Sequence, residues 1–203
     1  MTQTDLFADG PEHLDLPGAD VTVIRGALAP DVTGPVLAAL CDQVEWRHDS
    51  LRMYGREVPI PRLQAWYGDP DTEYTYSGLL LVPEAWIPPL LALRTVAEHF
   101  AGAEFDSVLC NRYRSGADGL AWHADDEPEL GRDPVIASVS LGAPRVFALR
   151  RRDDHAERHD VVLGDGDVLV MRGTTQALWE HSVPKTRHAV GERVNCTFRR
   201  IVR

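Results

Sequence analysis

Residues 135–172 read VIASVSLGAPRVFALRRRDDHAERHDVVLGDGDVLVMR and carry the clearest strand pattern in the chain. Short apolar, β-branched runs alternate there with polar turns, and Gly164-Asp165-Gly166-Asp167 is a strong hairpin signal. Many short strands at this spacing are typical of a sandwich or a double-stranded β-helix, also called a jelly roll. The pattern fills the C-terminal half, with strands predicted at 107–113, 135–141, 145–150, 160–163, 167–172 and 193–202.

Two helices are predicted before these strands. Pro30 suits the first turn of a helix over 30–45, and apolar residues follow there at helical spacing. A second helix is predicted over 87–101, where Pro88 and Pro89 suit the first turn and Gly102 can cap the end. We therefore expect a mainly β protein with flanking helices, an α+β class with a double-stranded β-helix (jelly roll) core.

The segment 51–81 differs in composition, because it mixes aromatic residues and arginines with Gly/Pro turns. Hairpins are predicted there, one turning near Gly55 and one near Gly68-Asp69-Pro70. Residues 1–20 lack periodicity and basic residues, so we expect an acidic flexible leader. The remaining residues, 21–203, are predicted to form a single domain.

The composition is that of an ordinary globular protein of 203 residues, with 44% hydrophobic and 26% charged residues. No apolar run approaches the roughly 18 residues that a membrane span needs, and we expect neither a membrane partner nor a secretory signal. Three widely spaced cysteines favour reduced thiols. These features predict a cytoplasmic monomer.

His123-Ala124-Asp125 is the first chemical signal. In an extended segment residues i and i+2 point to the same side, so this pair can hold one ion together. His181 is the best third ligand because it lies in a half-apolar segment, although His155, His159 and His188 are also available. Two histidines and one carboxylate form the facial triad of non-haem Fe(II) oxygenases. An H-x-D triplet alone arises often by chance, so the spacing leaves the alternatives open.

The last predicted strand reads RVNCTFR at 193–199. Alternation places its polar residues on one face and Val194, Cys196 and Phe198 on the other. The polar face suits either a solvated edge strand or a pocket for a dicarboxylate, since arginine pairs well with carboxylates. A dicarboxylate beside a facial-triad metal suggests 2-oxoglutarate. The polar residues are Arg193, Asn195, Thr197 and Arg199.

At this point the sequence resembles the AlkB family of Fe(II)/2-oxoglutarate dioxygenases. The motifs are NRYRSGADGLAWHADDE at 111–127, SVSLGAPRVFALR at 138–150, GDVLVMRG at 166–173, WEHSVPK at 179–185 and RVNCTFR at 193–199. The resemblance implies a double-stranded β-helix with Fe(II) held by His123, Asp125 and His181. It also implies a 2-oxoglutarate site formed by Asn111, Tyr113, Arg193, Asn195, Thr197 and Arg199, with O2 as the other cosubstrate.

The resemblance further implies the substrate. Its members act on N-alkylated bases such as 1-methyladenine and 3-methylcytosine, releasing formaldehyde, succinate and CO2. Asp126 matches the position near the exocyclic amine of the flipped base, as a catalytic and substrate-binding residue, and Glu127 lies beside it. The segment 51–81 resembles the nucleotide-recognition lid, which would contact the substrate through Tyr54, Arg62, Tyr74 and Tyr76.

Oxidative demethylation of DNA is therefore the predicted function. The alternatives are the same oxygenase chemistry on RNA or another methylated substrate, and a cupin-like protein that holds metal without turnover. The net charge of −10 argues against a nucleic-acid partner at first sight, but half of it lies in residues 1–20. Arginines gather in 145–152, in 185–203 and in 51–62. Such patches predict a modest, salt-sensitive affinity for DNA.

Overall fold

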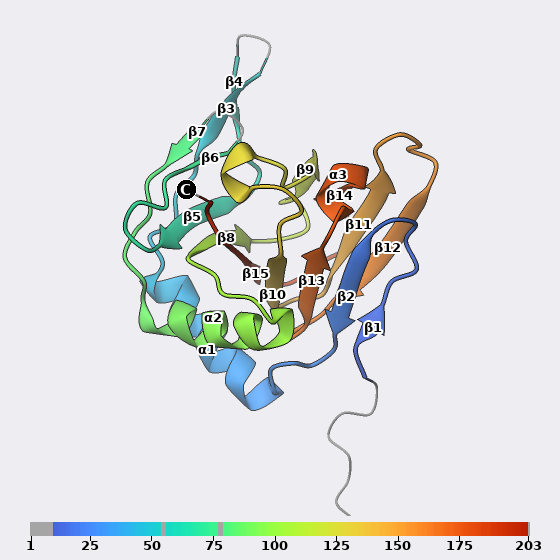
Figure 1. Ribbon diagram of the computed structural model, residues 1–203. Helices are drawn as coiled ribbons and strands as arrows, with labels where there is room; N and C mark the ends of the chain where they lie inside the picture. The colour runs from blue at the N-terminus through green and yellow to red at the C-terminus, as the bar shows by residue number, and fades with distance from the viewer. Residues whose placement is uncertain (1–9, 54–55, 77–78, 203) are drawn as a thin grey trace, which may run out of the picture.

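The computed structural model describes residues 10–53, 56–76 and 79–202, and of the strand residues 51–53, 56–57, 74–76 and 79–81 it describes the backbone alone. Two antiparallel sheets form the core (Figure 1). The larger has seven strands in the order β1 (Glu12–His13), β2 (Asp20–Ile24), β13 (Val168–Arg172), β10 (Ile136–Gly142), β15 (Arg193–Arg199), β8 (Ser107–Tyr113) and β5 (Leu63–Gly68). The smaller has four, in the order β12 (Arg158–Leu163), β11 (Arg145–Arg151), β14 (Trp179–Val183) and β9 (Leu120–His123). This is the predicted double-stranded β-helix.

The two predicted long helices are confirmed. Helix α1 (Pro30–Gln43) and helix α2 (Pro88–Ala101) both begin with proline, whose missing N–H costs nothing in a first turn. Helix α2 ends at Gly102, which adopts the left-handed conformation that glycine tolerates best. Both helices pack on the outer face of the larger sheet, and a short helix, α3 (Thr175–Leu178), precedes β14.

Two separate layers of apolar residues hold this arrangement together. One lies between the helices and the larger sheet and includes Leu40, Leu93 and Phe198. The other lies between the two sheets and includes Phe147, Leu149 and other buried side chains. Strand β15 lies between β10 and β8 in the larger sheet, and all of its residues are buried, which excludes the solvated edge strand that its sequence also allowed.

The predicted hairpin at Gly164–Asp167 is wrong. The turn exists, because Gly164 N donates to the carboxylate of Asp167. However, β12 pairs with β11 in the smaller sheet while β13 pairs with β10 and β2 in the larger. The turn therefore carries the chain from one sheet to the other, and the local sequence cannot distinguish this crossing from a hairpin.

The segment 51–81 holds two short hairpins that project from the sheets (Figure 1). One pairs β3 (Ser50–Met53) with β4 (Arg56–Pro59), as predicted, and its turn lies outside the described residues. The other pairs β6 (Tyr74–Tyr76) with β7 (Leu79–Leu81). The hairpin expected at Gly68–Pro70 is wrong, because β5 pairs along its length with β8 in the larger sheet.

The expected flexible leader does not hold for residues 10–20. Strand β1 pairs with β2, and Leu14 and Leu16 are buried in the layer between the sheets. The few apolar residues of this segment show no periodicity in the sequence. Burial of Leu14 and Leu16 is nevertheless enough to hold the segment against the sheets. Residues 1–9 lie outside the described part of the chain.

Candidate metal centre and cosubstrate pocket

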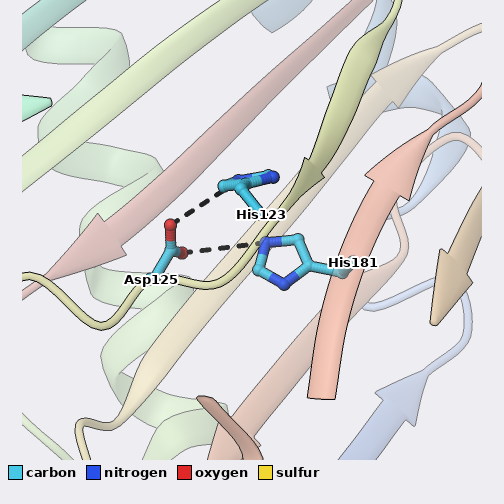
Figure 2. A group of neighbouring side chains, drawn as sticks. All are labelled: His123, Asp125 and His181. Carbon is cyan, nitrogen blue, oxygen red and sulfur yellow. Dashed lines mark ion pairs between the residues drawn. The ribbon is translucent and has the colours of Figure 1, made fainter. Parts of the chain in front are cut away.

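His123, Asp125 and His181 converge at one end of the space between the sheets (Figure 2). His123 is the last residue of β9, and His181 lies directly opposite it on the neighbouring strand β14. One ligand atom from each residue lies within 4.8 Å of the others. Nε2 of His123 is 3.7 Å from Asp125 Oδ1, and Nε2 of His181 is 4.0 Å from Asp125 Oδ2. Donor atoms about 2.1 Å from one shared ion lie roughly 3–4 Å apart, so the cluster fits a metal.

The protonation states of these side chains also suit a metal. Burial lowers the pKa of His123, and burial together with His123 lowers the pKa of His181 to about 3. Burial alone would raise the pKa of Asp125, but Arg199 and the two imidazoles hold it below its usual range. Neutral imidazoles and an ionised carboxylate are the forms that coordinate a cation.

Hydrogen bonds and stacking fix the orientation of the ligands. Nδ1 of His123 lies 2.9 Å from the carbonyl oxygen of Ala121, which favours the tautomer with its lone pair on Nε2, the atom that faces Asp125. The backbone N–H of Asp125 donates to Gln176 Oε1 at 2.9 Å. The ring of Phe147 stacks on His181 with centroids 5.1 Å apart. The cluster is therefore preorganised.

The predicted alternation of the last strand is confirmed in β15. Val194, Cys196 and Phe198 pack in the layer beneath the helices. The polar residues face the space between the sheets, where a pocket joins part of this face to the metal cluster. The side chains that line the pocket are Leu109, Asn111, Tyr113, Leu120, His123, Asp125, Ser138, Phe147, Met171, His181, Val183, Asn195, Thr197 and Arg199.

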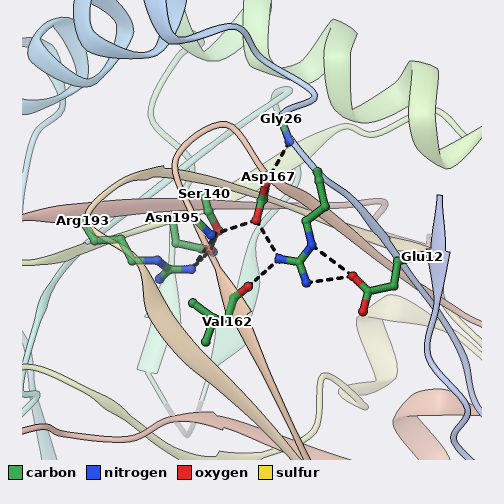
Figure 3. Close-up of polar contacts among 9 residues, drawn as sticks. Glu12, Gly26, Ser140, Val162, Asp167, Arg193 and Asn195 are labelled. Carbon is green, nitrogen blue, oxygen red and sulfur yellow. Dashed lines mark hydrogen bonds and ion pairs between the residues drawn. The ribbon is translucent and has the colours of Figure 1, made fainter. Parts of the chain in front are cut away.

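Arg193 is buried at the end of β15 away from the metal cluster, with 1% of its surface exposed. Its Nη2 donates to Ser140 Oγ at 2.9 Å and to Asn195 Oδ1 at 2.8 Å (Figure 3). Among the described residues, its Nε and Nη1 have no hydrogen-bond partner. Its guanidinium carbon lies 5.2 Å from the centre of the Tyr113 ring. A buried guanidinium with two unused donors fits a small-molecule carboxylate, as the 2-oxoglutarate prediction requires.

The other predicted cosubstrate residues extend from Arg193 towards the metal cluster. Asn195 Nδ2 donates to Thr197 Oγ1 at 2.9 Å. Arg199 ends the row, and its Nη2 lies 2.9 Å from Asp125 Oδ2. Asn111 faces Asn195 across the β8–β15 pair and accepts a hydrogen bond from Arg62 Nε at 2.5 Å. The structure therefore brings all six predicted cosubstrate residues together.

Sequence reasoning missed several residues of this site. Ser138 and Ser140 on β10 hydrogen-bond to Asn195 and Arg193 from the neighbouring strand. Their i, i+2 spacing in an otherwise apolar strand was a usable signal, because it places both hydroxyls on one face. Gln176 accepts a hydrogen bond from Asp125, and Phe147 stacks on His181, but no sequence pattern indicates either contact.

The structure does not bring the predicted substrate residues that it describes together in one place, as it does the cosubstrate residues. Asp126 is exposed and pairs with Arg152 at 2.6 Å, outside the pocket lining. Glu127 is half-buried two residues beyond Asp125. Arg62 is buried against Asn111, directly before β5. Tyr54 and the side chains of Tyr74 and Tyr76 lie outside the described residues.

The three alternative histidines do not join the cluster. In the part of the chain that the structure describes, the one group with metal-ligand spacing is His123, Asp125 and His181. His155 and His188 are exposed, and His159 lies half-buried on β12.

The arginine patch predicted at 145–152 is largely neutralised. Arg150 pairs with Glu180 at 2.6 Å, Arg151 with Asp153 at 2.8 Å and Arg152 with Asp126 at 2.6 Å. Arg145 is buried, with 4% of its surface exposed. Counting charges along the sequence overlooked these partners, so this patch is not the basic DNA surface that the sequence predicted.

Comparison with known proteins settles the family. The family model of the 2OG-Fe(II) oxygenase superfamily matches residues 20–199. The chain belongs to this superfamily. It is 43% identical over 178 residues to the alpha-ketoglutarate-dependent dioxygenase alkB homolog 3 of Rattus norvegicus, covering 82% of this chain and 59% of that protein. It is 37% identical over 210 residues to the DNA oxidative demethylase ALKBH2 of Mus musculus, covering 98% of this chain and 87% of that protein.

The resemblance to the AlkB family is thereby confirmed. The chain spans about three fifths of the length of the alkB homolog 3 relatives that it matches. The solved structure described as the structure of OsALKBH1 superposes with a TM-score of 0.64 at 20% identity, covering 93% of this chain and all of that one, and it supports the fold alone. The cofactors of the family are Fe(II) and 2-oxoglutarate, with O2 as cosubstrate, and the residues described above fit both bound groups. In the described residues no helix is long and apolar enough to cross a membrane.

Proposed function

We propose that this oxygenase is an Fe(II)- and 2-oxoglutarate-dependent oxidative demethylase that repairs N-alkylated bases in DNA. Its substrates are bases of the 1-methyladenine and 3-methylcytosine type, and its products are the unmodified base, formaldehyde, succinate and CO2. One observation carries the proposal. The His–Asp–His cluster lies at one end of the polar face of β15, and at the other end lies Arg193, which is buried and pairs with none of the described carboxylates. The names of the relatives, which include DNA oxidative demethylases, support the substrate class.

The chain's residues have distinct roles in this proposal. His123, Asp125 and His181 hold Fe(II), which with 2-oxoglutarate and O2 supplies the oxidation of the N-methyl group. Arg193 binds the distal carboxylate of 2-oxoglutarate beside Tyr113. Asn111, Asn195 and Thr197 provide the polar floor between the two ends. Arg199 holds Asp125 ionised and lies close to the carboxylate at the metal end.

The apolar walls of the pocket favour this chemistry. Leu109, Leu120 and Val183 line it together with Phe147, so a bound cosubstrate displaces water from both sides of the polar floor. The lower local dielectric strengthens the pairing of Arg193 with a carboxylate. It also strengthens the attraction between a cationic methylated base and the acidic residues at 125–127.

The substrate base enters from the side of the lid. Asp126 and Glu127 follow Asp125 directly, and in this proposal their carboxylates bind the base near the metal, Asp126 leaving its ion pair with Arg152. Arg62, Tyr54, Tyr74 and Tyr76 contact the base or its strand from the lid. Stacking on such tyrosines contributes about 1–3 kcal/mol per base.

A groove beside the pocket offers a path for the flanking strand. Trp122 precedes His123 on β9, and Arg158 and Lys185 line the same groove. The guanidinium carbon of Arg158 lies 5.7 Å from the Trp122 ring. Among the residues described as lining the groove there is no carboxylate. An aromatic ring with two cations suits a nucleic-acid backbone.

The cellular setting and the oligomeric state are also part of the proposal. The three cysteines are free thiols, and Cys110 and Cys196 share a hydrogen bond between sulfur atoms 3.9 Å apart without forming a disulfide. Free thiols at such proximity fit a reducing compartment, and we place the enzyme in the cytoplasm as a monomer.

Formaldehyde release tests the proposal. The protein is loaded anaerobically with Fe(II) and 2-oxoglutarate and exposed to O2 with oligonucleotides that carry 1-methyladenine. Single-stranded DNA, duplex DNA, RNA and unmethylated DNA are compared, and Asp153→Ala serves as a matched control for Asp125→Ala because Asp153 is exposed and distant in sequence from the cluster. Release with methylated DNA that Asp125→Ala abolishes supports the proposal. Activity on RNA alone, or 2-oxoglutarate consumption without demethylation, overturns the substrate assignment.

A further inference from the structure

Arg145, the first residue of β11, is a second buried guanidinium near Arg193. Its Nη2 donates to the carbonyl oxygens of Asp118 at 2.9 Å and Pro184 at 2.8 Å. Its Nη1 lies 3.3 Å from the carbonyl oxygen of Ser115. Among the described residues no ion pair joins it to a carboxylate, because Asp118 directs its own carboxylate to Arg114. Its direct partners are therefore backbone carbonyl oxygens, with the Asp118 carboxylate acting on it only from a distance.

Arg145 and Arg193 share one aromatic ring. The guanidinium carbon of Arg145 lies 5.6 Å from the centre of the Tyr113 ring, and that of Arg193 lies 5.2 Å from the same centre. Burial lowers the pKa of Arg193, and the positive charge of Arg145 lowers it further. Two buried cations thus lie around one fully buried tyrosine, and none of the described carboxylates pairs with either.

Such an arrangement is unfavourable unless an anion joins it. Like charges repel each other more strongly in a buried site than in water, and each guanidinium has also lost part of its hydration. A carboxylate bound by the unused Nε and Nη1 of Arg193 would relieve both costs at once. The field of Arg145 then adds to the attraction that Arg193 exerts.

We propose that Arg145 is a positioning residue for the cosubstrate, which raises the affinity for 2-oxo acids that carry a distal carboxylate. This inference rests on the proposed 2-oxoglutarate site. Arg145 does not touch the ligand; it acts through Tyr113 and Arg193 and through its own charge. It therefore contributes to selection of 2-oxoglutarate over monocarboxylic 2-oxo acids.

Binding measurements test this with two ligands. Calorimetry on the Mn(II)-loaded protein, which does not turn over, gives the Kd of 2-oxoglutarate and of 2-oxobutanoate, which lacks the distal carboxylate. We expect Arg145→Gln to raise the Kd of 2-oxoglutarate about tenfold, as a charge about 10 Å away at an effective dielectric constant of 20 would. The Kd of 2-oxobutanoate should stay within about twofold of the wild-type value. Arg151→Gln is the matched control, because Arg151 ends the same strand and pairs with Asp153.

A purely structural role gives a different result. If Arg145 only ties the loop at Ser115–Asp118 to Pro184, Arg145→Gln weakens both ligands equally, which overturns the proposal, as does no change in either. Should Arg145→Gln fail to fold, Arg145→Lys keeps the charge while losing the planar fork. The proposal then expects a Kd of 2-oxoglutarate within about threefold of wild type, and an equal tenfold weakening of both ligands overturns it. A wild-type protein that binds no 2-oxoglutarate would instead refute the proposed function.

Discussion

The two ends of β15 carry the same residue type on the same face of one strand, yet their surroundings are opposite. Arg199 lies 2.9 Å from the carboxylate of Asp125, which belongs to the metal cluster. Arg193 has no carboxylate among the described residues, and two of its donors have no hydrogen-bond partner there. The charge of Arg199 is therefore neutralised by a carboxylate of the protein, whereas the charge of Arg193 is neutralised only when an anionic ligand binds.

This difference shows how one strand can serve two kinds of ligand. At the Arg199 end the protein supplies negative charge, which suits a cation. At the Arg193 end it supplies uncompensated positive charge, which suits an anion. Substitutions at the two ends should therefore destabilise the ligand-free protein to different extents.

Asp125→Ala should have the largest effect. It removes a metal ligand, and loss of a supporting residue alone typically costs 10–100-fold in metal affinity, so we expect a loss of more than about 100-fold. It also deprives the buried Arg199 of its carboxylate, and breaking a buried pair destabilises by about 3–5 kcal/mol. Mn(II) titration and urea unfolding of the metal-free protein measure the two effects. The surface variant Asp153→Ala should leave both nearly unchanged, and a metal-free Asp125→Ala protein of wild-type stability would contradict the pairing argument.

Arg193→Met should separate binding from stability. We expect the Kd of 2-oxoglutarate to rise about 30-fold or more, because truncating one partner of a buried charge pair costs about 2–5 kcal/mol. The ligand-free protein should lose less than about 1 kcal/mol of unfolding free energy, since the variant removes a buried charge that pairs with none of the described carboxylates. Calorimetry and urea unfolding give the two values.

Arg199→Met provides the contrast on the same strand. It leaves the buried Asp125 without its guanidinium, so the ligand-free protein should be destabilised by about 3 kcal/mol. If the two methionine variants destabilise the ligand-free protein equally, the distinction between the two ends is wrong.

Much of this site was predictable from the sequence because strand alternation is a strict geometric rule. The i, i+2 spacing of His123 and Asp125 and the alternating residues of 193–199 determine which side chains share a face. The motif resemblance then linked His181, which lies opposite His123 only because β14 pairs with β9. Local sequence patterns do not reveal that pairing.

Partners that are distant in sequence explain the errors. The charge of residues 145–152 predicts a basic surface, yet Glu180 and Asp126 neutralise two of these arginines from other segments. Likewise, the turn at Gly164–Asp167 was correctly located, but which strands it joins depends on the pairing of β12 and β13 with different sheets. Local patterns fix turns and faces, whereas charge balance and sheet membership depend on tertiary structure.

Stability as a function of pH should depend on the metal end and not on the Arg193 end. The pKa of His181 is lowered by burial to about 3, while an unfolded histidine titrates near 6.5. Between these values the unfolded chain binds a proton that the folded chain does not, so the metal-free protein loses stability as pH falls from about 6.5 towards 3. The slope is at most about 1.4 kcal/mol per pH unit for each such histidine.

Urea unfolding at several pH values measures this slope. His181→Gln should flatten it, because one of the groups that resists protonation is gone. Arg193→Met should leave it unchanged, because arginine stays charged throughout this range. A slope that Arg193→Met alters as much as His181→Gln would show that the two ends are not independent in this respect.

The smallest effect is expected outside both ends, in the groove beside Trp122. Lys185→Ala removes one cation from the groove lining, and neutralising one phosphate contact lowers the slope of log affinity against log salt by about 0.7 for single strands. We expect a few-fold weaker binding of methylated single-stranded DNA at low salt, with the Kd of 2-oxoglutarate unchanged. Arg151→Ala is the matched control, because Asp153 already balances Arg151. Since neither end of β15 contacts this groove in the proposal, a change in 2-oxoglutarate affinity in Lys185→Ala would show that the strand path and the cosubstrate pocket are coupled.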